Sequence, residues 1–144
     1  MKTSASGIEL IKTFEGFSEK PYDDVVGKKT IGYGHLIKPG ESFGDKISRE
    51  EATDLLASDL GHAEECIETF VDVPLTQNEY DALISFIFNL GCGAFKGSTL
   101  LNLLNQNLKD AASKQFLRWD KAGGKRVAGL ARRRLAEQAM FRGD

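Results

Sequence analysis

One segment constrains the fold of this chain more than any other: "YDALISFIFNL", residues 80–90, is apolar on nearly every side when drawn as a helix. A helix without a polar face cannot lie at a surface, so this one belongs at the centre of a hydrophobic core. Thr76 and Glu79 have the spacing of a capping box and predict where the helix begins, and Gly91 follows its last apolar residue. Other elements must therefore cover this helix on all sides.

The N-terminal quarter predicts one helix followed by β-structure. Ser6 and Glu9 have capping-box spacing, and Gly16 is a natural stop for the helix that they open. Residues 20–34, "KPYDDVVGKKTIGYG", carry β-branched and aromatic side chains around the turn residue Gly27. This composition is typical of one or two short hairpins.

Helices predominate after residue 48. Ser48 and Glu51 form a further capping box, which opens a long helix running to about Phe70, with Gly61 weakening its middle. Three more helices are expected at about 98–107, 110–119 and 129–141.

The predicted fold class is therefore α+β, mostly helical, in a single domain of 144 residues. We expect a small N-terminal hairpin lobe (about 12–47), a connecting long helix (about 49–70) and a larger helical lobe (about 71–144) that includes the N-terminal helix. Ligand sites favour the junction between lobes.

Charge and hydropathy exclude several classes of function. The net charge of −2 gives no global attraction to nucleic acid or to an anionic membrane. No segment approaches about 18 continuous apolar residues, so no membrane insertion is expected. The N-terminus lacks the apolar run of a secretory signal.

Two cysteines, Cys66 and Cys92, could form one bridge, but each also fits a small apolar position in or beside a helix. We expect free thiols, which suits synthesis in a reducing compartment.

The candidate chemistry begins at the end of the first helix. Glu15 is expected at its last residue, where the negative end of the helix dipole and the apolar neighbours Phe14 and Phe17 disfavour a charged carboxylate. A carboxyl that keeps its proton can act as a general acid. Asp24 is expected at a hairpin turn, where water and backbone amides keep it ionised. Two carboxyls in such different environments form the acid/base pattern of glycosidases.

Thr30 follows Asp24 on the returning strand and could help to hold one water molecule in a fixed attacking position. Such a water needs carboxyls roughly 6.5–9.5 Å apart and leads to inversion at the sugar carbon. By itself, the spacing E-x8-D-x5-T is also compatible with ordinary capping and turn carboxylates.

The segment "FEGFSEKPYDDVVGKKTIGYGH" resembles the catalytic stretch of the phage-type lysozymes, glycoside hydrolase family 24, which includes many bacteriophage endolysins. "TQNEYDALISFIFNLGCGAFKGSTLLNLLN" and "GLARRRLAEQAMF" are similar to the central and C-terminal helical segments of that family, in the same order. The resemblance covers essentially the whole chain and implies a two-lobed, lysozyme-like fold.

The resemblance also implies an activity and a site. Glu15 takes the place of the general acid, Asp24 of the carboxylate that activates water, and Thr30 of the residue that helps to hold it. The implied substrate is the β-1,4 bond between N-acetylmuramic acid and N-acetylglucosamine in bacterial peptidoglycan, cleaved without a metal or cofactor. The residues implied to line the saccharide cleft are Leu36, Phe88, Asn89 and Ser98. An apolar helix could equally place Phe88 in the core, and the role of Ser113 stays open.

The implied biology is lysis of a host cell. An endolysin accumulates in the host cytoplasm, is released through a separate holin and acts on the cell wall in the periplasm; a monomer is expected. A catalytically silent peptidoglycan-binding module is the alternative, although binding alone would not require Glu15, Asp24 and Thr30 together. A lyase that leaves an anhydro sugar is a third hypothesis.

Other polar residues are given structural interpretations. His35 is expected to bridge the hairpin and the cleft wall by hydrogen bonds. His62 and Glu65 are expected on an exposed helix face, because no further ligands suggest a metal site. Asp23 and Glu19 are expected to be solvated turn charges.

The basic run Arg132, Arg133 and Arg134 leaves two interpretations open. The arginines could contact anionic cell-wall polymer, or they could pair with Glu137 one turn on and with other acids.

Overall fold

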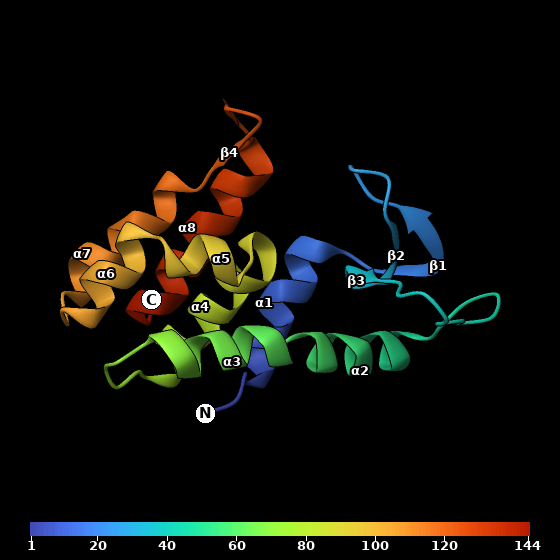
Figure 1. Cartoon of the computed structure of the whole chain (residues 1–144), viewed down its shortest axis with the longest axis horizontal. Helices are drawn as coiled ribbons and strands as arrows, with labels where there is room; N and C mark the ends of the chain where they lie inside the picture. The colour runs from blue at the N-terminus through green and yellow to red at the C-terminus, as the bar shows by residue number, and fades with distance from the viewer.

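Helix α4 (Gln77–Leu90) lies in the middle of the helical half of the protein, as the sequence predicts (Figure 1). The computed structural model describes residues 1–144, and α4 is buried from Glu79 to Ile87. Its capping box is present: the Thr76 hydroxyl accepts from the Glu79 amide at 3.1 Å, and the Glu79 carboxylate accepts from the Thr76 amide at 2.8 Å. The elements that pack against α4 are α1 (Ala5–Glu15), α3 (Gly61–Phe70), α5 (Cys92–Lys96) and α8 (Ala128–Arg142).

The helical half is completed by α6 (Thr99–Asn105), α7 (Lys109–Gln115) and the short 3-10 helix η1 (Phe116–Arg118). The ring of Phe86 on α4 meets Phe116 and Trp119 edge-on, with ring centroids 5.4 and 5.6 Å apart; Phe116 belongs to the helical core and Trp119 packs against it. A small hairpin, β4 (Lys121–Ala122) and β5 (Lys125–Arg126), and the short α5 were not expected from the sequence. No helix combines the length and the apolar character that crossing a membrane requires.

A three-stranded antiparallel sheet forms the other end of the molecule (Figure 1). Strand β1 (Ser18–Asp23) pairs with β2 (Lys29–Gly32), which pairs in turn with β3 (His35–Leu36). The register sets Tyr22 opposite Thr30, and Thr30 opposite Leu36. Helices α2 (Arg49–Asp59) and α3 run along one side from the sheet to the helical half. The fold is thus α+β and mostly helical, as expected.

The start of α1 differs from the prediction, because its N-cap is Ser4 and not Ser6. The Ser4 hydroxyl accepts from the Gly7 amide at 3.4 Å, and the Ser4 amide donates to the buried carboxylate of Asp81 on α4 at 3.0 Å. A Cβ atom at Gly7 would lie 2.8 Å from the Asp81 side chain, so the helix can approach α4 only through this glycine. A contact between distant segments therefore sets the helix start, and the local capping pattern did not reveal it.

The single long helix expected from Ser48 to Phe70 is divided into α2 and α3. The Ser48–Glu51 capping box opens α2 as predicted, but α2 ends at Asp59 and α3 begins at Gly61. The two pieces still run on nearly one line (Figure 1), since the Leu60 amide donates to the Leu56 carbonyl at 2.9 Å. Glycine at the junction is a poor helix former, which accounts for the break.

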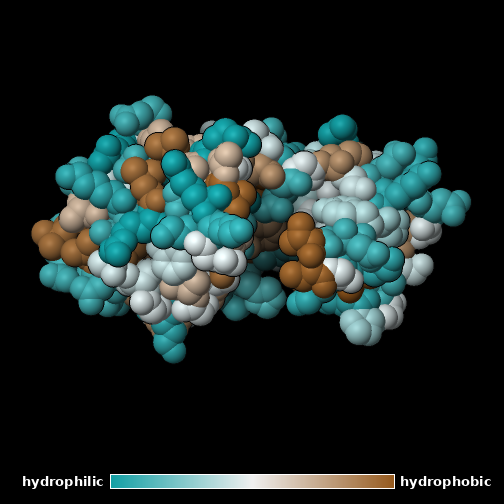
Figure 2. All heavy atoms as spheres, turned by 90° about the horizontal axis from the view of Figure 1, so that it is seen from above, coloured by the Kyte–Doolittle hydropathy of each residue, from teal (hydrophilic) through white to brown (hydrophobic).

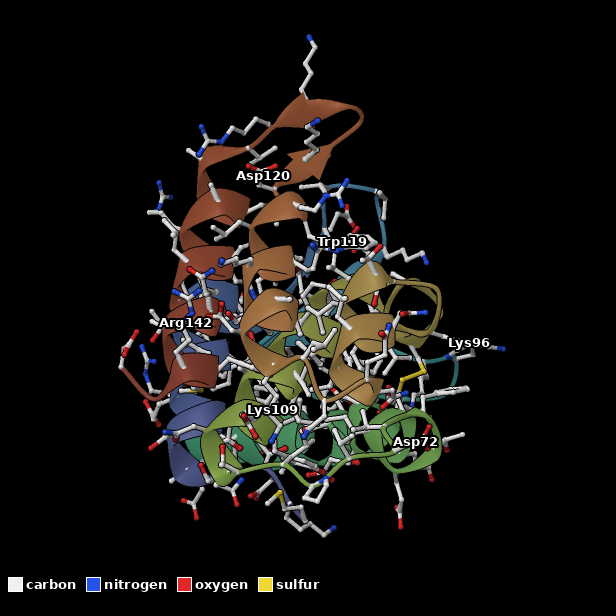
Figure 3. The ribbon with its side chains drawn as sticks, turned by 90° about the vertical axis from the view of Figure 1, so that its left-hand side faces the viewer. Asp72, Lys96, Lys109, Trp119, Asp120 and Arg142 are labelled. Atoms are coloured by element: carbon white, nitrogen blue, oxygen red, sulfur yellow. A yellow bond between two sulfur atoms is a disulfide. The ribbon has the colours of Figure 1, made fainter.

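The expectation of free thiols is wrong: Cys66 of α3 and Cys92, the first residue of α5, form a disulfide with their Cα atoms 5.9 Å apart. Figure 3 shows this bond in yellow. Gly91 ends α4 with a φ of 92°, a conformation open to glycine, and turns the chain so that α5 packs against α3. The pairing depends on this turn, which cysteine spacing alone cannot show.

Removing the disulfide is expected to lower the free energy of unfolding by about 3 kcal/mol, because the bridge closes a loop with a sequence separation of 26 residues. Urea unfolding of Cys66→Ala/Cys92→Ala against the oxidised protein measures this difference. In excess reductant the two proteins should differ by less than about 1 kcal/mol. A difference that survives reduction would mean that packing of the sulfur atoms, and not the cross-link, carries the stability.

Candidate active site

Glu15 is the last residue of α1, as predicted, and its carboxylate lies where the helix meets the sheet. Gly16 stops the helix with a φ of 71°. The side chain is 20% exposed and faces the backbone of Gly34, where an added Cβ atom would lie 2.8 Å from Oε1 of Glu15. A side chain at Gly34, where φ is 79°, would displace the Glu15 carboxyl from this position.

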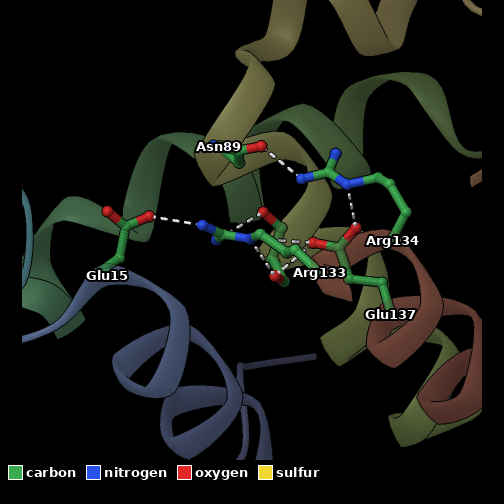
Figure 4. Close-up of polar contacts among 6 residues, drawn as sticks. Glu15, Asn89, Arg133, Arg134 and Glu137 are labelled. Atoms are coloured by element: carbon green, nitrogen blue, oxygen red, sulfur yellow. Dashed lines mark hydrogen bonds and ion pairs between the residues drawn. The ribbon is translucent and has the colours of Figure 1, made fainter. Parts of the chain in front are cut away.

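A partner for Glu15 comes from the far end of the chain. Nη1 of Arg133 donates to Oε2 of Glu15 at 2.7 Å, and the arginine side chain is only 5% exposed (Figure 4). Arg133 and Arg134 both pair with Glu137, as one of the two interpretations held, and Arg132 is exposed. The pair between Glu15 and Arg133 was not expected, because 118 residues separate the partners.

Asp24 occupies the turn between β1 and β2 and is half-buried. Its Oδ1 accepts from the backbone amides of Val26 at 3.0 Å and Lys28 at 2.8 Å, which is the amide environment that the sequence suggested. The neighbouring Asp23 pairs with Lys29 at the surface at 2.9 Å. These two hydrogen bonds fix the orientation of the Asp24 carboxylate in the turn.

Thr30 is buried on β2, and its hydroxyl donates to the Lys28 carbonyl at 3.0 Å. The hydroxyl proton is thereby occupied, while the oxygen lone pairs can still accept a hydrogen bond. The Thr30 hydroxyl can thus accept a hydrogen bond from a water molecule, while its own proton stays on the Lys28 carbonyl.

Tyr22 connects the two carboxylates. Burial, and then the negative charges of Glu15 and Asp24, raise the pKa of the Tyr22 phenol. Both carboxylates therefore lie near enough to the Tyr22 phenol to act on its pKa, although Asp24 and Thr30 do not line the cavity that Glu15 adjoins. No hydrogen bond joins the two carboxylates directly.

A cavity of about 370 Å³ adjoins Glu15 between the sheet and the helical half. Viewed from above, the molecule is hollowed between these two halves (Figure 2). The cavity is lined by Glu15, Gly34, Leu36, Lys38, Asp59, His62, Phe88 and Asn89. The wall is mixed in chemistry, with apolar side chains beside carboxylate, amide and cationic groups, as a saccharide site requires.

Three of the four residues implied for the saccharide cleft, Leu36, Phe88 and Asn89, therefore lie with Glu15. Ser98 lies elsewhere: it is the buried N-cap of α6, donates to the Phe95 carbonyl at 2.7 Å and does not line this cavity. Ser113 is also buried, and its hydroxyl donates to the Asp110 carbonyl at 2.7 Å.

Sequence reasoning missed three cavity residues, Lys38, Asp59 and His62. His62 and Glu65 are both exposed on α3, as expected, but His62 also lines the cavity, which was not expected. The break at Leu60 places His62 in the first turn of a new helix. Gly61 is the residue in the sequence that could have indicated this break.

His35 bridges elements as predicted. Its Nδ1 is 2.8 Å from Oδ2 of Asp59 on α2, and its Nε2 is 3.0 Å from Oε1 of Glu41 in the loop after β3. Burial lowers the pKa of His35, but the hydrogen bonds to Asp59 and Glu41 outweigh it and raise the pKa above 6.5. The Lys38 backbone amide and His35 lower the pKa of Glu41. This charged bridge fixes the sheet against α2 next to the cavity.

The bridge predicts how stability depends on pH. A raised folded-state pKa means that His35 contributes fully below its unfolded value of about 6.5, and that the contribution is lost as pH rises through the folded value. His35→Asn should therefore cost about 2 kcal/mol near pH 5.5 and clearly less near pH 9, because a hydrogen-bonded charge is lost only where histidine is charged.

Urea unfolding of both proteins at the two pH values measures this dependence. His62→Asn, which removes the other histidine, is the matched control and should show no such trend. An equal cost of His35→Asn at both pH values would contradict a charged bridge.

The fold and the site together define a lysozyme-type enzyme: a helix-end carboxyl faces a cavity between a helical half and a small sheet that carries a second carboxylate. Comparison with known proteins agrees. The family model for phage lysozyme matches residues 12–137. The endolysin of Salmonella phage P22 is 46% identical over 98% of both chains.

Solved structures are similar to the same extent. A crystal structure of a P22 lysozyme variant matches with a TM-score of 0.89 and 43% identity over 98% of each chain. The muramidase domain of SpmX from Asticaccaulis excentricus matches with a TM-score of 0.88 and 37% identity over 97% of each chain. This chain belongs to the phage lysozyme family.

Proposed function

We propose that this lysozyme hydrolyses the β-1,4 bond between N-acetylmuramic acid and N-acetylglucosamine in bacterial peptidoglycan. One observation carries the proposal: Glu15 opens into a cavity with Leu36, Phe88 and Asn89, between the helical half and the sheet whose hairpin turn holds Asp24. The similarity to a structure described as a muramidase supports the choice of bond.

In this proposal Glu15 is the general acid. Arg133 occupies Oε2, so the transferable proton resides on Oε1, the oxygen that faces Gly34 and the hairpin. The protonated carboxyl donates to the glycosidic oxygen as the bond to the sugar carbon breaks. Arg133 then stabilises the carboxylate that forms.

Asp24 and Thr30 position the attacking water. Asp24 accepts one water proton through the carboxylate that two backbone amides hold in place. Thr30 accepts the other hydrogen bond, because its own proton is committed to Lys28. The water oxygen is then directed at the sugar carbon from the face opposite Glu15, and the product forms with inversion.

Product analysis tests this reaction. Digested peptidoglycan should yield reducing N-acetylmuramic acid ends that carry the elements of water, and early NMR spectra should show the α-anomer in excess. Anhydro ends would identify a lyase instead, and an initial excess of the β-anomer would contradict inversion. Binding to the wall without new reducing ends would identify a silent binding module.

For the biological setting we infer host-cell lysis by a monomer that stays in the cytoplasm until a separate holin opens the inner membrane. Expression in a bacterial cytoplasm should leave cells intact until the inner membrane is permeabilised from outside. Rapid lysis on expression alone would contradict this setting.

A further inference from the structure

A buried polar cluster lies behind the proposed site. Glu137 of α8 is fully buried between Arg133 and Arg134 of the same helix (Figure 4). Its Oε2 accepts from the Ser85 hydroxyl at 2.5 Å and lies 3.4 Å from Nε of Arg133, and its Oε1 lies 3.1 Å from Nε of Arg134. Nη2 of Arg133 also donates to the Ser85 carbonyl at 3.3 Å.

Stability does not explain such a cluster. Three charged side chains leave water here, and apolar residues of similar volume often stabilise a core as well as a buried ion pair does. Burial raises the pKa of Glu137 and lowers that of Arg134, which shows that the environment works against both charges. The cluster is best explained by what it holds in place.

The two arginines hold two residues of the same cavity. Arg133 reaches Glu15 at 2.7 Å, and Nη2 of Arg134 donates to the side-chain oxygen of Asn89 (Figure 4). Glu15 and Asn89 both line the cavity between the sheet and the helical half. The buried carboxylate of Glu137 is therefore connected through Arg133 to Glu15, the proposed general acid, and through Arg134 to the amide of Asn89 on α4.

The contact with Arg134 decides the chemistry that Asn89 offers. A guanidinium only donates hydrogen bonds, so it must bind the amide oxygen and cannot accept from the amide nitrogen. The side chain is thereby prevented from flipping, and its NH₂ group is left for the cavity. Where the cavity binds a sugar chain, the NH₂ group of Asn89 can donate only to an oxygen of the sugar. The acetamido carbonyl is a strong acceptor on both sugars of the proposed substrate.

We propose that Arg133, Glu137 and Arg134 form one positioning unit, in which Arg133 fixes the carboxyl of Glu15 and Arg134 fixes Asn89 as a hydrogen-bond donor to an acetamido carbonyl of the saccharide. The proposal rests on the proposed function. Arg134 and Glu137 touch no substrate themselves and act through the residues that do.

A double-mutant cycle tests whether Arg134 acts through Asn89. Arg134→Met should raise KM for soluble N-acetylated peptidoglycan fragments about tenfold, with kcat changed less than about twofold, because a binding contact loses its orientation. Asn89→Ala should raise KM to a similar extent. In the Asn89→Ala background, Arg134→Met should add less than about twofold. Effects that multiply would overturn the proposal, because Arg134 would then act without Asn89.

Two further variants keep the test decisive. Arg132→Met removes an exposed arginine two positions before Arg134 and should leave KM within about twofold of the wild type. A rise equal to that of Arg134→Met would attribute the effect to net charge and overturn the proposal. Asn89→Asp keeps the shape and the contact with Arg134 but loses the donor, so it should fold and still raise KM about tenfold. Wild-type KM in Asn89→Asp would overturn the proposal even if Arg134→Met did not fold.

Failure of this inference is distinguishable from failure of the proposed function. An active Glu15→Gln variant would remove the general acid, whereas the cycle reports only whether Arg134 acts through Asn89. Multiplying effects in the cycle together with an inactive Glu15→Gln would leave the reaction in place and remove the positioning unit.

Discussion

Glu15→Gln lowers kcat by about 10³-fold while the protein stays folded: this is the largest effect that we expect from a single substitution. Glutamine has nearly the shape of glutamate and its amide oxygen can still accept from Nη1 of Arg133, so the contact seen at 2.7 Å has a replacement. It has no acidic proton to give to the glycosidic oxygen. Loss of turbidity in a peptidoglycan suspension measures the activity, and thermal unfolding measures whether the variant stays folded.

The matched control for this variant is Glu9→Gln. Glu9 lies on the same helix, but its carboxylate is 71% exposed and pairs only with Lys12 at 3.5 Å. Its removal should change neither activity nor unfolding by more than a small amount, since exposed pairs contribute little. Full lytic activity of folded Glu15→Gln would remove Glu15 from the reaction.

Asp24→Asn should give the second largest effect, a fall in kcat of about 10²-fold or more with little change in KM. The asparagine oxygen can accept from the Val26 and Lys28 amides as the carboxylate does, so the hairpin turn keeps its geometry. The variant lacks the basic oxygen that takes a proton from the attacking water. Steady-state kinetics on soluble peptidoglycan fragments separate the two parameters.

Asp23→Asn is the natural control, because Asp23 precedes Asp24 in the chain and pairs only with Lys29 at the surface. It should retain nearly full kcat. If Asp24→Asn keeps wild-type kcat, the carboxylate takes no part in activating water, and a lyase-like route becomes the better account of any cleavage observed.

The sequence predicted those parts of the fold that depend on local signals. The capping boxes at Ser48 and Thr76 begin helices because each side chain bonds to a backbone amide three residues away. The same pattern at Ser6 failed, since the contact between Ser4 and Asp81 begins α1 earlier. Local propensity is a weak guide where a contact with a distant segment decides which residue caps the helix.

The same distinction between local and distant contacts applies to the residues of the site. Glu15 and Asp24 could be proposed because a helix end and a hairpin turn in one short segment indicate where they lie. The apolar surroundings expected for Glu15 were incomplete, because Arg133 pairs with its carboxylate. Arg133 could not, because its contact with Glu15 depends on how α8 lies against α1 and α4 in space. The disulfide of Cys66 and Cys92 depended equally on a turn that cysteine spacing does not describe.

The ion pair of Glu15 and Arg133 joins the first helix of the chain to the last. During translation, Glu15 is made long before Arg133, the residue that holds its carboxylate. The site is therefore completed only when α8 has been made. A fragment that stops before α8 lacks the arginine that pairs with Glu15, and it lacks the helix that packs against α4. For an enzyme that attacks a cell wall, catalytic competence thus requires that α8 has already been translated.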